Sequence, residues 1–162
     1  MKEIIKIARV DKRTLHATVA LNWNRFISVD EFIVVNRQYV KDPFVEQIIQ
    51  LTIPDQKVSI MNPDNFISYI NRDLEEKKTA MVIFKDIASL REAIEKGFYV
   101  PEVQHLYPSR FMSKSEVKKY FSPEDQESLI YIESKGIVNY FQTDPYQDKT
   151  YFSIKRDAAA SE

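Results

Sequence analysis

Short apolar runs alternate with amphipathic segments along most of this sequence. The apolar runs are rich in β-branched residues, which is typical of buried parallel strands. We expect strands over residues 4–8, 31–35, 57–61, 79–84, 100–106, 137–142 and 150–155. The segments between them repeat apolar residues at helical spacing. We expect helices over residues 15–26, 43–51, 63–75, 87–96 and 123–135.

The ends of the predicted helices carry local signals. A capping residue precedes a proline at Asp42-Pro43, Asn62-Pro63 and Ser122-Pro123, a pairing that favours the start of a helix. Gly97 follows the segment 87–96 and Gly136 follows the segment 123–135, and both glycines are suited to end a helix.

Two further predictions concern packing. In the helix that begins at Pro43, we expect Phe44, Ile48, Ile49 and Leu51 to form the buried apolar face. We expect residues 113–121 to form a short exposed connection with some local structure.

Alternation of strands and helices with short connections predicts an α/β fold. We expect a single-domain, open, mainly parallel twisted sheet with helices on both faces, and an antiparallel edge strand is compatible with this pattern. The domain is expected to span residues 1–156, and we expect residues 157–162, which are of low complexity, to form a disordered tail. Ligands of such sheets bind outside the carboxyl ends of the strands.

Composition narrows the function classes. The net charge of −1 argues against bulk nucleic-acid binding. The absence of cysteine excludes disulfides, thiolate metal sites and cysteine nucleophiles, and two glycines are too few for a phosphate-binding loop or a dinucleotide fingerprint. No signal-peptide pattern and no apolar stretch of about 20 residues is present, so we expect a cytoplasmic protein.

The strongest chemical signal is His16, one of only two histidines. It follows the first predicted strand, and Arg9, Lys12 and Arg13 lie within seven residues of it. A neutral imidazole accepts a phosphoryl group near physiological pH, and guanidinium groups bind phosphate oxygens. The pattern therefore indicates phosphoryl transfer.

The segment from Ala8 to His16 resembles the active-site loop of the IIB component of the mannose/fructose/sorbose class of the bacterial sugar phosphotransferase system (PTS). That loop reads approximately Arg-hydrophobic-Asp-Asp-Arg-hydrophobic-hydrophobic-His-Gly-Gln-Val. Trp23, the strand over 31–35 followed by Asp42-Pro43-Phe44, the strand over 79–84 and the helix over 122–136 also fit the family in order and spacing.

The resemblance implies that His16 accepts a phosphoryl group from a phosphohistidine on a IIA partner. His16 then passes the group to a sugar bound by the membrane IIC/IID components. Contact with the membrane is expected only through these components, and a homo-oligomer is compatible with the sequence. The resemblance implies no metal and no cofactor.

Roles for other residues follow from the same resemblance. Arg9 and Arg13 are expected to clamp the phosphate. Asp11 either holds the His16 ring or the arginines by hydrogen bonds, or it shapes the loop or caps the following segment. Lys12 and the backbone near Ala17 and Thr18 are candidate phosphate-binding groups.

Three further residues are candidate neighbours of the site, namely Asn36, Arg37 and His105. For His105 a surface or packing role is the favoured interpretation.

The sequence also departs from the family pattern. Ala17 and Thr18 replace the usual glycine and glutamine after the histidine, Lys12 replaces a frequent aspartate, and Gln104-His105 replaces paired glycines. Asn36-Arg37 stands in place of a frequent acidic pair, and Asn22 in place of a frequent arginine. The changes at 12, 36 and 37 remove acid or add base, whereas the change at 22 removes base, and on balance we expect a more electropositive pocket.

The same departures favour an alternative function, a divergent IIB-like interaction or regulatory module with weak or no phosphotransfer. A small flavodoxin-like ligand binder or receiver fits less well. A receiver needs acidic residues after its first strand, whereas basic residues predominate in this loop.

Overall fold

The computed structural model describes residues 2–13, 23–108 and 113–155 and contains one sheet of seven strands in the order β3-β2-β4-β1-β5-β6-β7. Six strands are parallel, and only the pairing of β6 with β7 is antiparallel. The predicted mainly parallel sheet is therefore confirmed, and the antiparallel strand lies at one edge. The tail at 157–162 and most of the helix expected at 15–26 lie outside the described residues.

The strands are short and their bounds are close to those expected from the sequence. They are β1 (Ile4–Val10), β2 (Glu31–Val35), β3 (Lys57–Met61), β4 (Thr79–Phe84), β5 (Glu102–His105), β6 (Val138–Phe141) and β7 (Thr150–Phe152).

Helices connect most of the strands. They are α2 (Pro43–Thr52), α3 (Pro63–Ile70), α4 (Ile87–Glu95), α5 (Lys114–Tyr120), α6 (Pro123–Ser134) and the 3-10 turn η1 (Tyr39–Lys41). Residues 23–26 are also helical.

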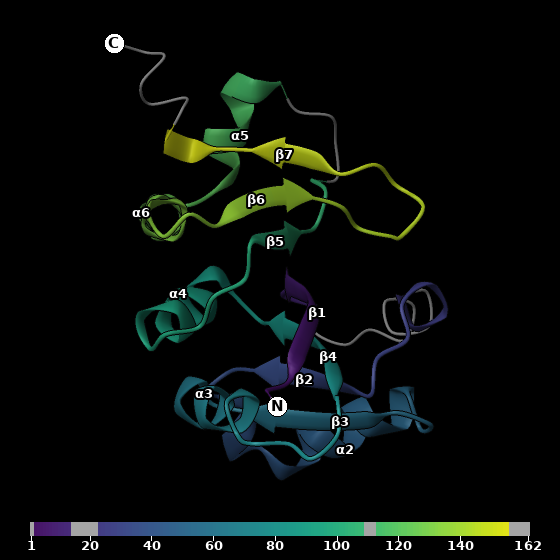
Figure 1. The fold of residues 1–162 in the computed structure, drawn as a ribbon. Helices are drawn as coiled ribbons and strands as arrows, with labels where there is room; N and C mark the ends of the chain where they lie inside the picture. The colour runs from purple at the N-terminus through teal and green to yellow at the C-terminus, as the bar shows by residue number, and fades with distance from the viewer. Residues whose placement is uncertain (1, 14–22, 109–112, 156–162) are drawn as a thin grey trace.

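Helices cover both faces of the sheet (Figure 1). Alternate residues of a strand point to opposite faces, so Ile33 and Val35 belong to one core and Phe32 and Val34 to the other. The larger core includes residues of α3, α4 and α6, and the smaller core includes Trp23 and residues of α2.

The caps predicted from the sequence are present. The side chains of Asp42, Asn62 and Ser122 each accept a hydrogen bond from a backbone N–H in the first turn of the following helix. Asp86 caps α4 in the same way. Gly97, with a φ of 105°, follows the end of α4 in the left-handed region where glycine carries no Cβ penalty.

Three local predictions were wrong. Helix α3 ends at Ile70 rather than near residue 75. The segment over 113–121 contains the helix α5, whose Val117 packs with the neighbouring Phe121 in the larger core, rather than an exposed connection. Strand β7 ends at Phe152.

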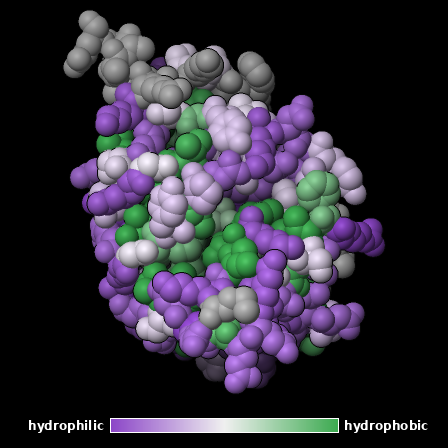
Figure 2. Space-filling model, in the orientation of Figure 1, coloured by the Kyte–Doolittle hydropathy of each residue, from purple (hydrophilic) through white to green (hydrophobic). Residues whose placement is uncertain are grey.

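The buried face predicted for α2 was also wrong. Phe44, Ile48 and Leu51 are 68%, 63% and 79% exposed, and only Ile49 of the predicted four is buried. Helix α2 is ten residues long and contacts the sheet near its edge strand β3. An edge strand offers little apolar surface, so only one narrow stripe of α2 is needed to cover it. The space-filling view shows that apolar side chains also reach the surface of the molecule, among mainly hydrophilic ones (Figure 2).

Candidate functional site

The topology of the sheet singles out the carboxyl ends of β1 and β5. The chain leaves β1 toward β2 on one side of the sheet, and it leaves the adjacent β5 toward β6 on the other side. Ligands of open α/β sheets bind at such a switch point, because the outgoing loops separate there. Arg9 and Gln104 are partners in the register of these two strands.

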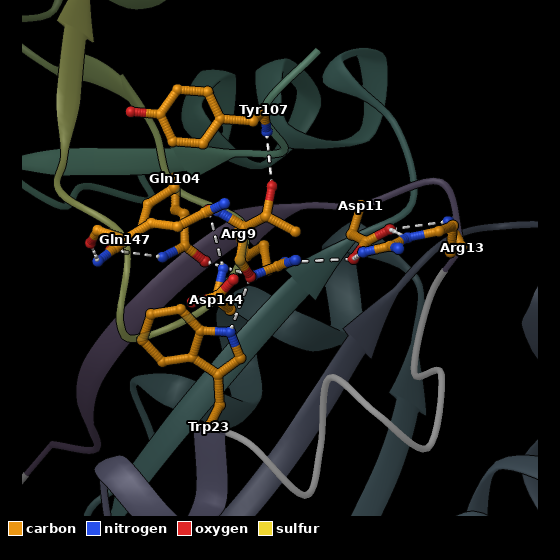
Figure 3. A network of polar contacts seen from close by, with 10 residues as sticks. Arg9, Asp11, Arg13, Trp23, Gln104, Tyr107, Asp144 and Gln147 are labelled. Carbon is orange, nitrogen blue, oxygen red and sulfur yellow. Dashed lines mark hydrogen bonds and ion pairs between the residues drawn. The ribbon is translucent and has the colours of Figure 1, made fainter. Parts of the chain in front are cut away.

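Arg9 is fully buried at this point and binds three different acceptors (Figure 3). Its Nε donates to Asp11 Oδ2 at 3.2 Å, and its Nη1 donates to Gln104 Oε1 at 2.8 Å and to the Thr143 carbonyl at 2.9 Å. Arg9 Nη2 is buried and has no hydrogen-bond partner among the described residues. Burial lowers the pKa of Arg9 from its usual value, and the charge of Asp11 opposes that shift.

Asp11 joins Arg9 to Arg13. Its buried carboxylate accepts hydrogen bonds from the Arg13 backbone N–H at 2.9 Å and from Arg13 Nε at 3.3 Å. The Arg13 side chain is 45% exposed, whereas those of Arg9 and Asp11 are inaccessible. Two guanidinium groups therefore share one carboxylate, and the cluster keeps a net positive charge.

The Thr143 carbonyl, in the loop after β6, accepts a second hydrogen bond from Trp23. Trp23 Nε1 lies 3.2 Å from this oxygen, and the Trp23 ring centroid lies 6.0 Å from the Arg9 guanidinium carbon. Trp23 is almost completely buried. Arg13 directly precedes residue 14 in the sequence and binds Asp11, and Trp23 binds the same Thr143 carbonyl as Arg9.

A chain of glutamine side chains extends from Arg9. Gln104 Nε2 donates to Gln142 Oε1 at 3.1 Å, and Gln142 Nε2 donates to the Gln147 carbonyl at 2.8 Å. Gln147 Oε1 in turn accepts from the backbone N–H groups of Thr143 at 2.8 Å and Asp144 at 3.2 Å. The loop between β6 and β7 is thereby tied to the arginine.

The structure brings three of the predicted site residues together, namely Arg9, Asp11 and Arg13. Lys12 lies between them in the chain and is exposed. His16, Ala17 and Thr18 lie outside the described residues.

Asn36 and Arg37 form separate contacts. Asn36 Oδ1 accepts from the backbone N–H groups of Gln38 and Tyr39 at 2.9 and 3.1 Å, which shapes the turn after β2. Arg37 Nε donates to Glu92 at 2.9 Å, and its Nη2 donates to Asp64 at 3.1 Å. These carboxylates offset the charge of Arg37, so Arg37 does not add free positive charge as the sequence suggested.

His105 points to the opposite face of the sheet from its neighbour Gln104. It is buried against the aromatic rings of Phe121, Phe141 and Phe152. Its Nε2 lies 2.9 Å from the side-chain amide oxygen of Asn139. Burial lowers the pKa of His105 to about 4. This packing position agrees with the favoured interpretation of His105.

Sequence reasoning did not assign a role at the site to Gln104, Gln142, Thr143 or Gln147. One signal was available, because the carboxyl ends of all parallel strands lie at the same edge. Thr143 directly follows the strand predicted over 137–142. The side-chain hydrogen bonds themselves depend on strand order and register, which the sequence does not reveal.

Within residues 2–13, 23–108 and 113–155 no three His, Asp or Glu side chains are grouped so that they could hold a metal ion. The helices of this described part are also too short or too polar to cross a membrane. The cluster of two guanidinium groups and one carboxylate carries a net positive charge, which favours an anion.

Comparison with known proteins identifies the family. Residues 5–151 match the PTS system sorbose subfamily IIB component. This chain belongs to that family. The sorbose-specific EIIB component of Lacticaseibacillus casei is 25% identical to this IIB chain over 95 residues, which cover 58% of each protein. The mannose-specific EIIAB component of Escherichia coli K12 is 22% identical over 148 residues, covering 88% of this chain and 46% of the relative. The IIB chain thus spans about half the length of these relatives.

Solved structures show the same fold. The IIBSor domain of the sorbose permease from Klebsiella pneumoniae superposes with a TM-score of 0.78 over 98% of both chains, at 13% identity. The manxB structure from Thermoanaerobacter tengcongensis also gives a TM-score of 0.78, over 93% of both chains at 17% identity. The α/β architecture of the IIB chain is therefore that of PTS IIB proteins.

Proposed function

We propose that this IIB chain is a phosphocarrier whose His16 accepts a phosphoryl group from a phosphorylated IIA protein or domain. His16 then transfers the group to a sugar bound by the membrane IIC/IID components during uptake. The name of the E. coli relative, an EIIAB component, supports an A-type donor. The proposal places the chain in the cytoplasm and at the membrane only through IIC/IID.

The observation that carries the proposal is the cluster of Arg9, Asp11 and Arg13. It combines two guanidinium groups with a single carboxylate at the switch point of the sheet. Because three residues of extended chain span at most about 11 Å, covalent connectivity limits how far His16 can lie from Arg13. A phosphoryl group on His16 is thus within reach of this positive charge.

The reaction requires little beyond positioning and charge stabilisation. A neutral imidazole nitrogen of His16 attacks the phosphorus atom, and a new N–P bond forms as the N–P bond of the donor breaks. Arg9 and Arg13 stabilise charge on the oxygens of the transferring group. In the second step the sugar hydroxyl attacks phosphorus, the His16 N–P bond breaks, and the hydroxyl proton is released.

The alternative is a IIB-like interaction or regulatory module with weak or no phosphotransfer. It is favoured by Ala17 and Thr18, which stand where the family pattern has glycine and glutamine, and by Lys12 in place of an aspartate. These residues flank the histidine, so they bear directly on its ability to react.

Phosphorylation in a reconstituted system separates the two functions. The protein is incubated with phosphoenolpyruvate, the general phosphotransferase proteins and a cognate IIA, and its mass is measured. We expect an acid-labile gain of one phosphate that His16→Ala abolishes. His105→Ala serves as the matched control if circular dichroism shows that it folds, and it should retain the label. Absence of label on the unmodified protein with an active IIA would contradict the carrier function.

A further inference from the structure

Two of the three groups that hold the Arg9 guanidinium are neutral. Arginine has five N–H donors in a rigid plane. Asp11 takes the Nε donor, and Gln104 with the Thr143 carbonyl takes both donors of Nη1. Within the described part of the chain, only the two donors of Nη2 are left without an acceptor, although this nitrogen is buried.

We infer that Gln104 is a positioning residue that fixes the Arg9 guanidinium so that its Nη2 binds a phosphoryl oxygen. The inference rests on the proposed function, and it adds a residue that lies on β5, far from His16 in the sequence. Gln104 would act through Arg9 and would not touch the phosphoryl group itself.

The chemistry of the acceptors supports this role. An amide oxygen and a backbone carbonyl restrain Arg9 without neutralising its charge, whereas a second carboxylate would cancel the net charge of the cluster. A buried donor left without an acceptor costs free energy, and an incoming phosphoryl oxygen removes that cost at Nη2.

The orientation of Gln104 is also determined by the arginine. Arg9 only donates, so the Gln104 oxygen must face it, and the Gln104 amide N–H₂ must face Gln142 Oε1. That contact in turn directs the Gln142 N–H₂ to the Gln147 carbonyl. The whole chain of amides therefore has one favourable direction, which fixes Gln104 and ties it to the loop that supplies the Thr143 carbonyl.

Two substitutions separate positioning from charge. Gln104→Met is close in volume and removes the acceptor, whereas Gln104→Glu keeps an acceptor and adds a negative charge. Gln126→Met is the matched control, because Gln126 Nε2 donates to the carbonyls of Lys118 and Phe121 in a different part of the fold. All three variants are compared with the unmodified protein by thermal unfolding.

The first measurement is the single-turnover rate of phosphorylation by phosphorylated IIA over a range of IIA concentrations. We expect Gln104→Met to lower the maximal rate about 10-fold and to leave the half-saturating IIA concentration within about twofold, since positioning affects the transferring group rather than docking. Gln126→Met should retain the unmodified rate. Equal maximal rates for Gln104→Met and Gln126→Met would overturn the inference.

The second measurement does not depend on phosphotransfer. In ¹⁵N NMR spectra, the restrained Arg9 guanidinium should give separate N–H signals, identified by their loss in Arg9→Lys. We expect these signals to shift on titration with inorganic phosphate, to broaden in Gln104→Met, and to stay sharp in Gln104→Glu with a weaker response to phosphate.

The two proposals fail in different ways. If the unmodified protein takes up no phosphate from IIA, the carrier function fails, and the phosphate titration alone tests Gln104. If Arg9 signals and phosphate affinity are the same in Gln104→Met and Gln126→Met, Gln104 does not position Arg9.

Discussion

At the scale of single residues, the two arginines of the cluster differ in burial and in the number of groups that hold them. Arg9 is buried and shares its donors among Asp11, Gln104 and Thr143, whereas Arg13 is half exposed and is held by Asp11. Loss of one member of a buried ion pair typically lowers the free energy of unfolding by about 3–5 kcal/mol. A substitution of Arg9 would therefore change both stability and phosphotransfer. Arg13 is the better probe of the proposed phosphate pocket.

We expect Arg13→Ala to slow phosphorylation by IIA about 10- to 100-fold, because it removes one cationic donor from the phosphoryl group. Its unfolding free energy should fall by less than about 1 kcal/mol, since the side chain is partly exposed. Single-turnover phosphorylation and urea unfolding measure the two effects. Arg25→Ala, which removes an exposed arginine outside the cluster, is the control, and equal rates for both variants would remove Arg13 from the site.

At the scale of elements, α2 shows where an apolar pattern is ambiguous. Helical spacing correctly predicted an amphipathic helix, but it does not state which apolar stripe meets the sheet. Ile49 is buried in the smaller core, whereas the adjacent Ile48 is largely exposed. The placement of α2 beside the edge strand β3 determines that Ile49, rather than Ile48, is buried.

The neighbouring isoleucines of α2 provide a matched test of this packing. We expect Ile49→Ala to lower the free energy of unfolding by about 2–4 kcal/mol, because it leaves a cavity in the smaller core. Ile48→Ala should change it by less than about 0.5 kcal/mol, since that side chain is mainly in solvent. Urea unfolding of both variants measures the difference, and similar losses would contradict the observed face of α2.

At the scale of the whole molecule, two buried titratable groups make stability depend on pH in opposite directions. Glu3 lies beside Glu31 at the amino-terminal edge of the sheet, with Arg72 Nη1 2.7 Å from its carboxylate. Tyr69 and Lys57 contact Glu31 in the same group. Burial, together with Glu31, raises the pKa of Glu3 to about 7, whereas burial lowers the pKa of His105 to about 4.

The sign of each effect follows from proton linkage. Folded Glu3 binds its proton more tightly than the unfolded chain does, so its stabilising contribution is present below about pH 4.5 and is lost as pH rises through about 7. His105 behaves in the opposite way, because the unfolded chain binds its proton more tightly. Its contribution is present above about pH 6.5 and is lost as pH falls toward 4.

Glu3→Gln should therefore change the pH profile of stability. We expect the unfolding free energy of the unmodified protein, relative to this variant, to decrease as pH rises from about 4.5 to 7. Glu3→Gln retains His105. The unfolding free energy of this variant should therefore increase between about pH 4.5 and 7, and more steeply than the unfolding free energy of the unmodified protein. Urea unfolding at several pH values measures both profiles, and parallel profiles would contradict the raised pKa of Glu3.

The sequence by itself determined the class of fold, most strand positions, the helix caps and the grouping of Arg9, Asp11 and Arg13. These features depend on residues close together in the chain, where periodicity and local hydrogen bonds act. Tertiary structure decided that Gln104 and Thr143 hold Arg9, that His105 packs on the opposite face, and that Arg37 binds two carboxylates. Those contacts depend on strand order and register, which join residues separated by as many as 134 positions.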